Sequence, residues 1–259
     1  MIKKFLVITF FAALAADARA LSVKHDFTAF IGPFNASTAE FEYVLQPHEY
    51  AVRSTVRTNG TFNLLYPFEA QYFTGGRIEN GRMETAAYRY KSKSRFSKRS
   101  KEMVYDRDGQ PVYSISTKNG KQKKKTIEVN ADNKNTTNLQ TVLAAIAKHY
   151  NEVRFCDSEM RIFDGKKRYN VIFRDEGTEE LKADGNSPFS GAAAKCSMYI
   201  DKLGDDGDDL LWQLSSERPV YFWILRDSKT AAPFIARIKI KETPLGEMNV
   251  YTTKIEVKK

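Results

Sequence analysis

The two cysteines of this chain are the residues whose side chains are most able to react. Cys156 and Cys196 form an even pair, and an even pair of cysteines in an oxidising compartment indicates a disulfide. A catalytic thiol needs a neighbouring histidine or another activating group, and nothing in the sequence supplies one. We therefore predict a disulfide between Cys156 and Cys196. Two free, buried thiols are the alternative.

The acidic residues and the histidines do not predict a metal site. The acidic run at 205–209 (D-D-G-D-D) suggests calcium, but its spacing differs from that of an EF-hand loop and no glutamate closes it. A solvated turn is the simpler interpretation. The three histidines, His25, His48 and His149, are scattered and lack the spacing of metal ligands. We predict neither a metal nor a cofactor.

The sequence has no motif of a common enzyme class. It contains no G-x-S-x-G nucleophile turn, no H-E-x-x-H zinc motif and no glycine-rich phosphate loop. We therefore expect a protein that binds a ligand or a partner rather than one that catalyses a reaction.

The N-terminal segment predicts where the protein works. Two early lysines precede an apolar run over residues 5–16, and A-R-A at 18–20 matches an A-x-A cleavage site. The run is too short to span a bilayer, so residues 1–20 are typical of a secretory signal peptide. We predict export to the periplasm and cleavage after Ala20, which leaves 21–259 as one β-rich domain without a transmembrane span. An N-terminal core helix is the alternative.

The chain is basic, with a formal net charge of +9 over 259 residues. In the cytoplasm such a charge would suggest nucleic acid as the partner. Export excludes nucleic acid and leaves anionic envelope material, such as lipid headgroups, acidic glycans or acidic proteins. With 42% hydrophobic residues, the chain is long and apolar enough to fold around a large core.

Period-two alternation of apolar and polar residues predicts a mainly β protein. Asn-Gly or Asp-Gly pairs that begin at positions 59, 108, 119 and 164 favour the positive φ angles of tight hairpin turns. About ten to twelve antiparallel strands make a sheet too wide to stay flat. We expect a strongly curved antiparallel sheet or incomplete barrel with one helix packed on its concave side. The predicted strands are Phe41–Leu45, Ala51–Thr58, Tyr113–Thr117, Thr126–Asn130, Glu159–Phe163, Tyr169–Arg174, Cys196–Ile200, Val220–Leu225, Phe234–Ile240 and Met248–Val257.

One segment has the spacing of an amphipathic helix rather than a strand. Apolar residues recur every three or four positions from Leu139 to Tyr150, with Thr137 or Asn138 as the N-cap. A second apolar stretch, Phe62–Phe73, contains a proline and fits either a short helix or an apolar loop.

A curved sheet of this kind offers an apolar hollow. Apolar pockets with few polar groups are the usual form of sites for lipid chains. We predict that the helix and the second apolar stretch line such a site. The predicted lining residues are Phe62, Leu64, Leu65, Tyr66, Phe68, Leu139, Val142, Leu143 and Ile146.

Positive charge gathers in two stretches, at 89–101 and 118–125. If the strands that carry them are neighbours, their cations form one patch that suits an anionic partner. The alternative is a solvated edge strand, whose lysines deter aggregation. The predicted patch consists of Arg89, Lys91, Lys93, Arg95, Lys121, Lys123 and Lys125.

The C-terminal half carries a characteristic series of turns. Arg161–Phe173 holds a strand, an Asp-Gly turn and a second strand. A later strand ends in Asp227 before a short turn to Pro233, and a P-L-G turn at 244–246 starts the last strand. This series resembles the exported bacterial family called domain of unknown function 3108. The resemblance implies a periplasmic β-rich fold similar to the open barrels that carry lipoproteins or bind lipids, and it implies no assigned chemistry. The two basic stretches are not part of the family pattern.

Two functions fit these observations. The leading one is a non-catalytic periplasmic binding or envelope-maintenance protein that holds a lipid or another apolar ligand in the concave sheet. The alternative is an interaction module that binds an anionic envelope partner (a protein, a glycan or a lipid headgroup) through the basic patch.

Overall fold

The computed structural model describes residues 20–106, 108–128, 136–163, 165, 168–203 and 218–258. The first part of the chain forms a run of strands, with one short helix, α1 (Gly60–Leu65), inserted between the third and the fourth. The strands are β1 (Leu21–Ile31), β2 (Phe34–Leu45), β3 (Glu49–Thr58), β4 (Phe68–Glu79), β5 (Arg82–Ser94), β6 (Lys98–Tyr105), β7 (Pro111–Lys118) and β8 (Lys121–Thr126).

The second part of the chain begins with helix and returns to strands. A 3₁₀ turn, η1 (Leu139–Thr141), leads directly into α2 (Val142–Val153). The strands that follow are β9 (Ser158–Phe163), β10 (Arg168–Leu181), β11 (Gly191–Leu203), β12 (Val220–Arg226), β13 (Pro233–Thr243) and β14 (Gly246–Lys258).

All fourteen strands belong to one sheet, in the order β8-β7-β6-β5-β4-β3-β2-β1-β14-β13-β12-β11-β10-β9. Except for β8 and β9, strands that follow one another in the chain pair antiparallel, and β1 also pairs with β14. The sheet therefore winds like a barrel but stays open between its edge strands, β8 and β9. This arrangement confirms the predicted curved antiparallel sheet.

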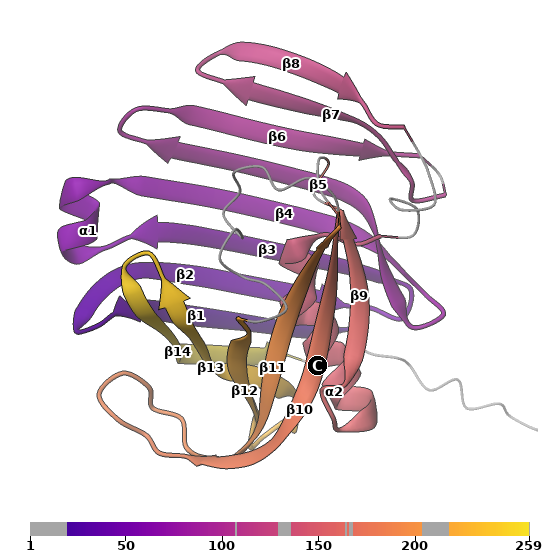
Figure 1. Cartoon of the computed structure of the whole chain (residues 1–259). Helices are drawn as coiled ribbons and strands as arrows, with labels where there is room; N and C mark the ends of the chain where they lie inside the picture. The colour runs from indigo at the N-terminus through magenta and orange to yellow at the C-terminus, as the bar shows by residue number, and fades with distance from the viewer. Residues whose placement is uncertain are drawn as a thin grey trace, which may run out of the picture.

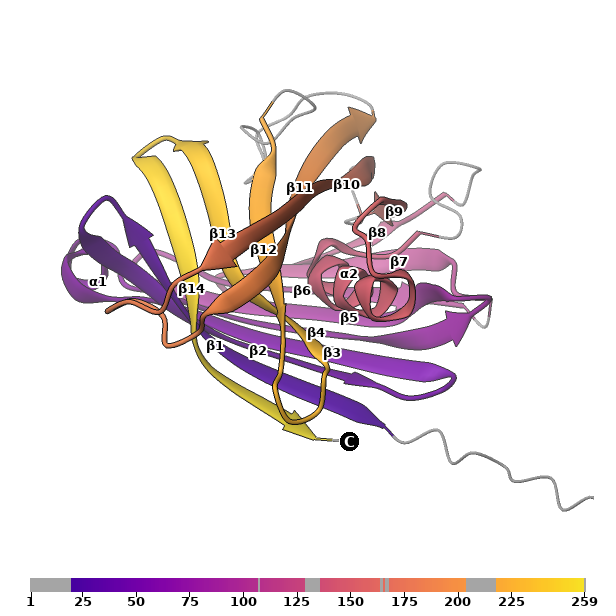
Figure 2. The same ribbon diagram turned by 90° about the horizontal axis from the view of Figure 1, so that it is seen from below.

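The helix α2 packs on the concave side of the sheet, as predicted. Figure 1 shows β1–β8 side by side as one curved layer with β9–β11 crossing in front of it. In Figure 2, α2 lies between this layer and β9–β11. Val142 and Ile146 pack into a core with β9–β13, whereas Ala144, Ala145 and Ala147 pack against β1–β5. The small alanines let the helix lie close to the N-terminal strands.

The helix begins and ends at residues whose chemistry suits these positions. The Asn138 side-chain oxygen accepts a hydrogen bond from the Thr141 N–H over 3.3 Å, which caps η1. Arg154 adopts a left-handed conformation at φ 69° after the last turn, and its N–H donates to the Tyr150 carbonyl. These contacts confirm the predicted helix and Asn138 as its N-cap.

Not every Asn-Gly pair of the sequence forms a hairpin turn. Asn119 and Gly120 have φ angles of 48° and 83° and join β7 to β8, as predicted for a tight hairpin. The prediction of a hairpin at Asn59 is wrong, because its side chain accepts the Gly60 N–H over 2.9 Å and starts α1 instead. Asp164, the acidic run at 205–209 and residues 1–19 lie outside the described residues. The eighth strand ends at Thr126, where the sequence predicted a strand to start.

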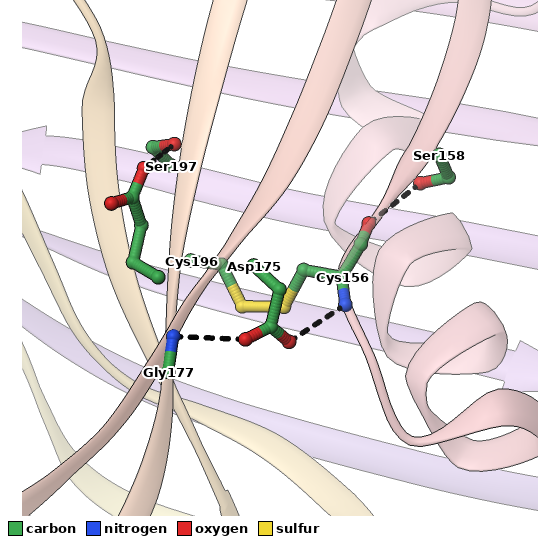
Figure 3. Close-up of a disulfide and its surroundings, with 7 residues drawn as sticks. Cys156, Ser158, Asp175, Gly177, Cys196 and Ser197 are labelled. Carbon is green, nitrogen blue, oxygen red and sulfur yellow. Dashed lines mark hydrogen bonds between the residues drawn. A yellow bond between two sulfur atoms is a disulfide. The ribbon is translucent and has the colours of Figure 1, made fainter.

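The structure joins Cys156 and Cys196 as a disulfide, with Cα atoms 6.0 Å apart. The bond ties the loop after α2 to β11, and both cysteines are fully buried. The Asp175 carboxylate accepts the Cys156 N–H over 3.2 Å and the Gly177 N–H over 2.9 Å. Figure 3 shows this carboxylate beside the disulfide, between the backbone nitrogens of Gly177 and Cys156. The disulfide thus fixes the position of α2 against the C-terminal strands.

Candidate binding cavity

A cavity of about 520 Å³ lies on the concave side, between the inner face of β1–β6, the start of the helix, and parts of β10, β13 and β14. Its volume lies within the about 300–1,000 Å³ typical of small-molecule sites, and its wall is mostly aliphatic and aromatic, as such sites usually are. The lining residues are Phe27, Ala39, Phe41, Ser54, Val56, Tyr72, Tyr88, Met103, Asn138, Leu139, Gln140, Leu143, Tyr169, Ile238 and Val250.

Buried hydrogen bonds hold η1 against the sheet at one end of the cavity. The Thr74 hydroxyl lies 2.9 Å from the Gln140 side-chain oxygen and 3.2 Å from that of Asn138. The Gln140 amide donates to the Ser54 hydroxyl over 3.2 Å, and the Asn138 amide donates to the Thr85 hydroxyl over 3.2 Å. Because buried polar groups need partners, this network fixes the part of the helix that lines the cavity. Thr74 and Thr85 carry no signal in the sequence that predicts this role, since isolated threonines are common in strands.

Tyr72 on β4 and Tyr88 on β5 form part of the cavity wall, and Tyr90 lies beside Tyr72. The rings of Tyr72 and Tyr90 lie 4.9 Å apart, and the Tyr90 hydroxyl donates to Ser92 over 2.7 Å. Burial raises the pKa of Tyr72 to about 12, with the neighbouring Tyr90 as the second cause. Tyr72 is therefore uncharged at neutral pH and presents a largely apolar ring to the cavity.

The structure separates the predicted lining residues of the helix into two groups. Leu139 and Leu143 line the cavity. Val142 and Ile146 do not, because they are 2% and 0% exposed in the core with β9–β13. Helical spacing identified all four as apolar positions on one side of the helix, but it does not show which of these side chains pack into a core and which face a cavity.

Of the second apolar stretch, Phe62–Phe73, only Tyr72 lines the cavity, so the prediction is wrong for the residues that it named. Figure 1 shows α1 at the end of β3 and β4, away from α2, and the helix has no buried residue. Leu64 and Leu65 are 75% and 71% exposed, because a six-residue helix at a strand connection reaches no core. The displaced residues are Phe62, Leu64, Leu65, Tyr66 and Phe68, of which Phe68 lines a separate groove beside Arg95.

The predicted basic patch is divided between the two faces of the sheet. Residues directly opposite each other in paired strands point to the same face. Lys91 on β5 lies opposite Ser100 on β6. Ser100 lies opposite Thr117 on β7, and Thr117 lies opposite Gln122 on β8, the residue before Lys123. Because side chains alternate along a strand, Lys91 faces away from the side that holds Lys123.

The prediction of one continuous patch is therefore wrong. Arg89 and Lys93 share the outer face with Lys91, whereas Lys121 and Lys125 share the inner face with Lys123. Arg95 lies in the turn after β5, where its guanidinium donates to the Leu64 carbonyl over 3.1 Å. Sequence proximity could not show this division, since it depends on the register of four strands.

His25 is a structural residue of the inner face. Its ring stacks on Phe27 at a centroid distance of 5.2 Å, with Phe41, Tyr43 and Phe234 close by. Burial lowers the pKa of His25 to about 3. The imidazole is therefore neutral at physiological pH. In the described part of the chain, no cluster of three or more histidines, cysteines or acids is placed to hold a metal.

The turn that follows β12 has a clear structural basis. The Asp227 carboxylate accepts hydrogen bonds from the Thr230 hydroxyl over 2.7 Å and from the N–H groups of Thr230 and Lys229. These bonds, the Thr230 hydroxyl foremost, lower the pKa of the Asp227 carboxyl. The P-L-G turn likewise connects β13 to β14. Both motifs noted in the sequence thus shape the sheet and do not line the cavity.

The fold and the cavity define an open, curved β-sheet protein with an interior helix and an apolar hollow. The chain belongs to the family described as "Protein of unknown function (DUF3108)", whose model matches residues 26–253. This match confirms the resemblance in the sequence. Among the described residues, no helix is both long and apolar enough to cross a membrane.

Two solved structures show distant similarity. A beta-barrel-like protein of domain of unknown function DUF1849 from Brucella abortus is 9% identical, with 93% of this chain and 98% of that chain covered and a TM-score of 0.49. MucB in complex with MucA(peri) is 13% identical, with 94% and 90% covered and a TM-score of 0.15. Both TM-scores are below 0.5, so neither likeness supports an inference about a ligand. No curated protein matches the chain.

Proposed function

We propose that this protein is a non-catalytic binding protein of the periplasm that holds a lipid chain or another apolar ligand in its concave cavity. The observation that carries the proposal is the apolar wall of that cavity, with Phe27, Phe41, Val56 and Leu143 among its members. An alkyl chain gains about 0.8 kcal/mol for each methylene group that it buries. We place the protein's role in maintenance of the cell envelope, where such chains are abundant.

Native mass spectrometry of the protein purified from its own envelope tests this function. We expect the folded protein to carry an additional mass that is lost on denaturation and that extracts into organic solvent. If the folded protein has the mass of the polypeptide alone and takes up no added palmitoyl-lysophosphatidylcholine, the proposal is wrong.

A pair of tryptophan variants separates the cavity from the rest of the surface. Ala39 lines the cavity on β2, and the adjacent Thr38 points to the outer face. Ala39→Trp should fill the cavity and lower ligand affinity about tenfold or more, at a cost in stability of about 1–3 kcal/mol for overpacking. Thr38→Trp, the matched control, should leave binding unchanged. A folded Ala39→Trp protein with normal affinity would contradict the proposal.

Export is part of the same proposal. The first strand begins at Leu21, so cleavage after Ala20 would leave the sheet intact. N-terminal sequencing of the mature protein should start at Leu21, and a protein that retains Met1 in the cytoplasm would contradict export.

A further inference from the structure

The inner face of the N-terminal strands changes character from one end to the other. Paired positions form rows across the sheet, since each residue lies opposite one on the next strand. One such row runs through Phe41, Ser54, Tyr72, Tyr90, Lys101 and Lys123. The row thus passes from the apolar Phe41 through Tyr72, which lines the cavity, and its neighbour Tyr90 to lysines toward the open edge.

The rows on either side change in the same way. One passes from Val56 on β3 to Arg99 on β6, and the other from Val52 to Lys125 on β8. No aspartate or glutamate occupies these rows in the described strands β1–β8. We name their cations the inner basic wall. It consists of Arg99, Lys101, Lys118, Lys121, Lys123 and Lys125.

The outer face of the same strands is built differently. There Arg89 pairs with Glu102 over 3.1 Å, and Arg57 pairs with Glu69 over 3.4 Å. Arg99, Lys118, Lys121, Lys123 and Lys125, by contrast, form no ion pair with any residue that the structure describes. No described acid therefore pairs with these five inner cations, whereas the outer face carries ion pairs of both signs.

We propose that the inner basic wall holds the anionic headgroup of an amphiphile whose alkyl chain occupies the cavity. This inference rests on the proposed function and assigns the ligand's charge and orientation. The cavity residue Tyr72 neighbours Tyr90, and Tyr90 lies opposite Lys101 on β6. A chain that leaves the cavity past the two tyrosines therefore meets cations next.

The distances suit a headgroup. Neighbouring strands are about 4.8 Å apart, so Lys125 on β8 lies about 10 Å from the cavity residue Met103 on β6. Lysine and arginine bind phosphate oxygens with charge-assisted hydrogen bonds. A one-signed concave surface also concentrates the field that attracts an anion. These effects favour an anionic headgroup over a zwitterionic one on the same chain.

The test compares two lipids with the same chain and two variants with the same loss of charge. The probes are palmitoyl-lysophosphatidylglycerol, which is anionic, and palmitoyl-lysophosphatidylcholine, which is net neutral. Dissociation constants are measured below micelle concentrations for the mature protein. We expect the anionic lipid to bind about tenfold more tightly, and this preference to shrink as salt screens the charges.

The inner variant is Lys121→Ser/Lys123→Ser/Lys125→Ser, and the matched outer control is Lys91→Ser/Lys93→Ser/Lys98→Ser. The inner variant should lose about five- to tenfold in affinity for the anionic lipid and stay within twofold for the neutral one. The outer control should change neither value.

Several other results would contradict the inference. Equal affinities for the two lipids in the unmodified protein, or equal losses in both variants, would show that the inner basic wall does not select the headgroup, while the cavity still binds chains. If the inner variant loses the same affinity for both lipids, the inner basic wall does not distinguish their headgroups. Binding of neither lipid would remove the proposed function and this inference together.

Discussion

The two halves of the sheet use their inner faces for different purposes. In the C-terminal half, β9–β13 close tightly on α2, and residues such as Ile146, Ile162 and Phe173 are fully buried. In the N-terminal half, the same inner face leaves a cavity and then becomes basic toward β8. One continuous sheet therefore packs around most of α2 on both sides and leaves a cavity, lined mainly by N-terminal strands, that is free to bind.

Removal of the disulfide should have the largest effect on stability. Cys156 and Cys196 are 40 residues apart in the chain, and closing a loop of this length stabilises a fold by about 4 kcal/mol in the chain-entropy model. We expect the double variant Cys156→Ala/Cys196→Ala to lose a comparable free energy of unfolding, measured by chemical denaturation, and to keep its ligand affinity at temperatures where it is folded. An unchanged unfolding free energy would show that the bond is not a main constraint.

Two positions on α2, three residues apart, should respond in opposite ways. Ile146→Ala leaves a void in a packed core and should cost about 2–5 kcal/mol of stability. Leu143→Ala enlarges a cavity that already exists, so it should cost less than Ile146→Ala and weaken ligand binding instead. Denaturation and lipid titration of both variants measure the contrast. If Leu143→Ala is as destabilising as Ile146→Ala and leaves binding unchanged, the helix does not divide the two regions.

Acid should destabilise the fold through His25. Its folded pKa of about 3 lies below the ordinary value of 6.5, so below pH 6.5 the unfolded chain binds a proton that the folded protein excludes. The stabilisation is complete above pH 6.5 and is lost as the pH falls toward 3, by about 1.4 kcal/mol per pH unit for one group.

A variant isolates this histidine from the carboxyl groups that also titrate in acid. His25→Phe keeps a ring beside Phe27 and removes the titration. We expect the loss of stability between pH 6.5 and 4.5 to be smaller in this variant by about 2–3 kcal/mol. The same pH dependence in both proteins would mean that the imidazole is hydrated, and that the inner face near β1 is not a dry core.

The sequence predicted the C-terminal half better than the N-terminal half for a physical reason. Val220–Leu225 and Phe234–Ile240 are dense in apolar residues, because β12 and β13 are buried over much of both faces, and such runs are read easily as strands. The strand β1 escaped detection because its inward positions alternate with charged ones and include His25. Its burial comes from neighbouring rings that the local sequence does not show.

The candidate site was predicted only in part. Helical spacing identified Leu139 and Leu143, since an amphipathic pattern is a local property. The position of α1 outside the cavity and the distribution of the cations over two faces could not be predicted. Both depend on how the strands are arranged in the sheet. Whether Lys123 shares a face of the sheet with Tyr90 or with Lys91 depends on a register set through β6 and β7, and a shift of one residue would exchange the two faces.

The central claim is that the cavity of the N-terminal half takes up an alkyl chain. Methyl NMR during a titration with palmitoyl-lysophosphatidylcholine tests it most directly, because each labelled methyl group reports on its own surroundings. The account predicts the largest shifts at Val56, Leu139 and Leu143, with Ile146 in the packed core almost unchanged. Shifts confined to the exposed Leu64 and Leu65, or no shifts at any of these positions, would contradict it.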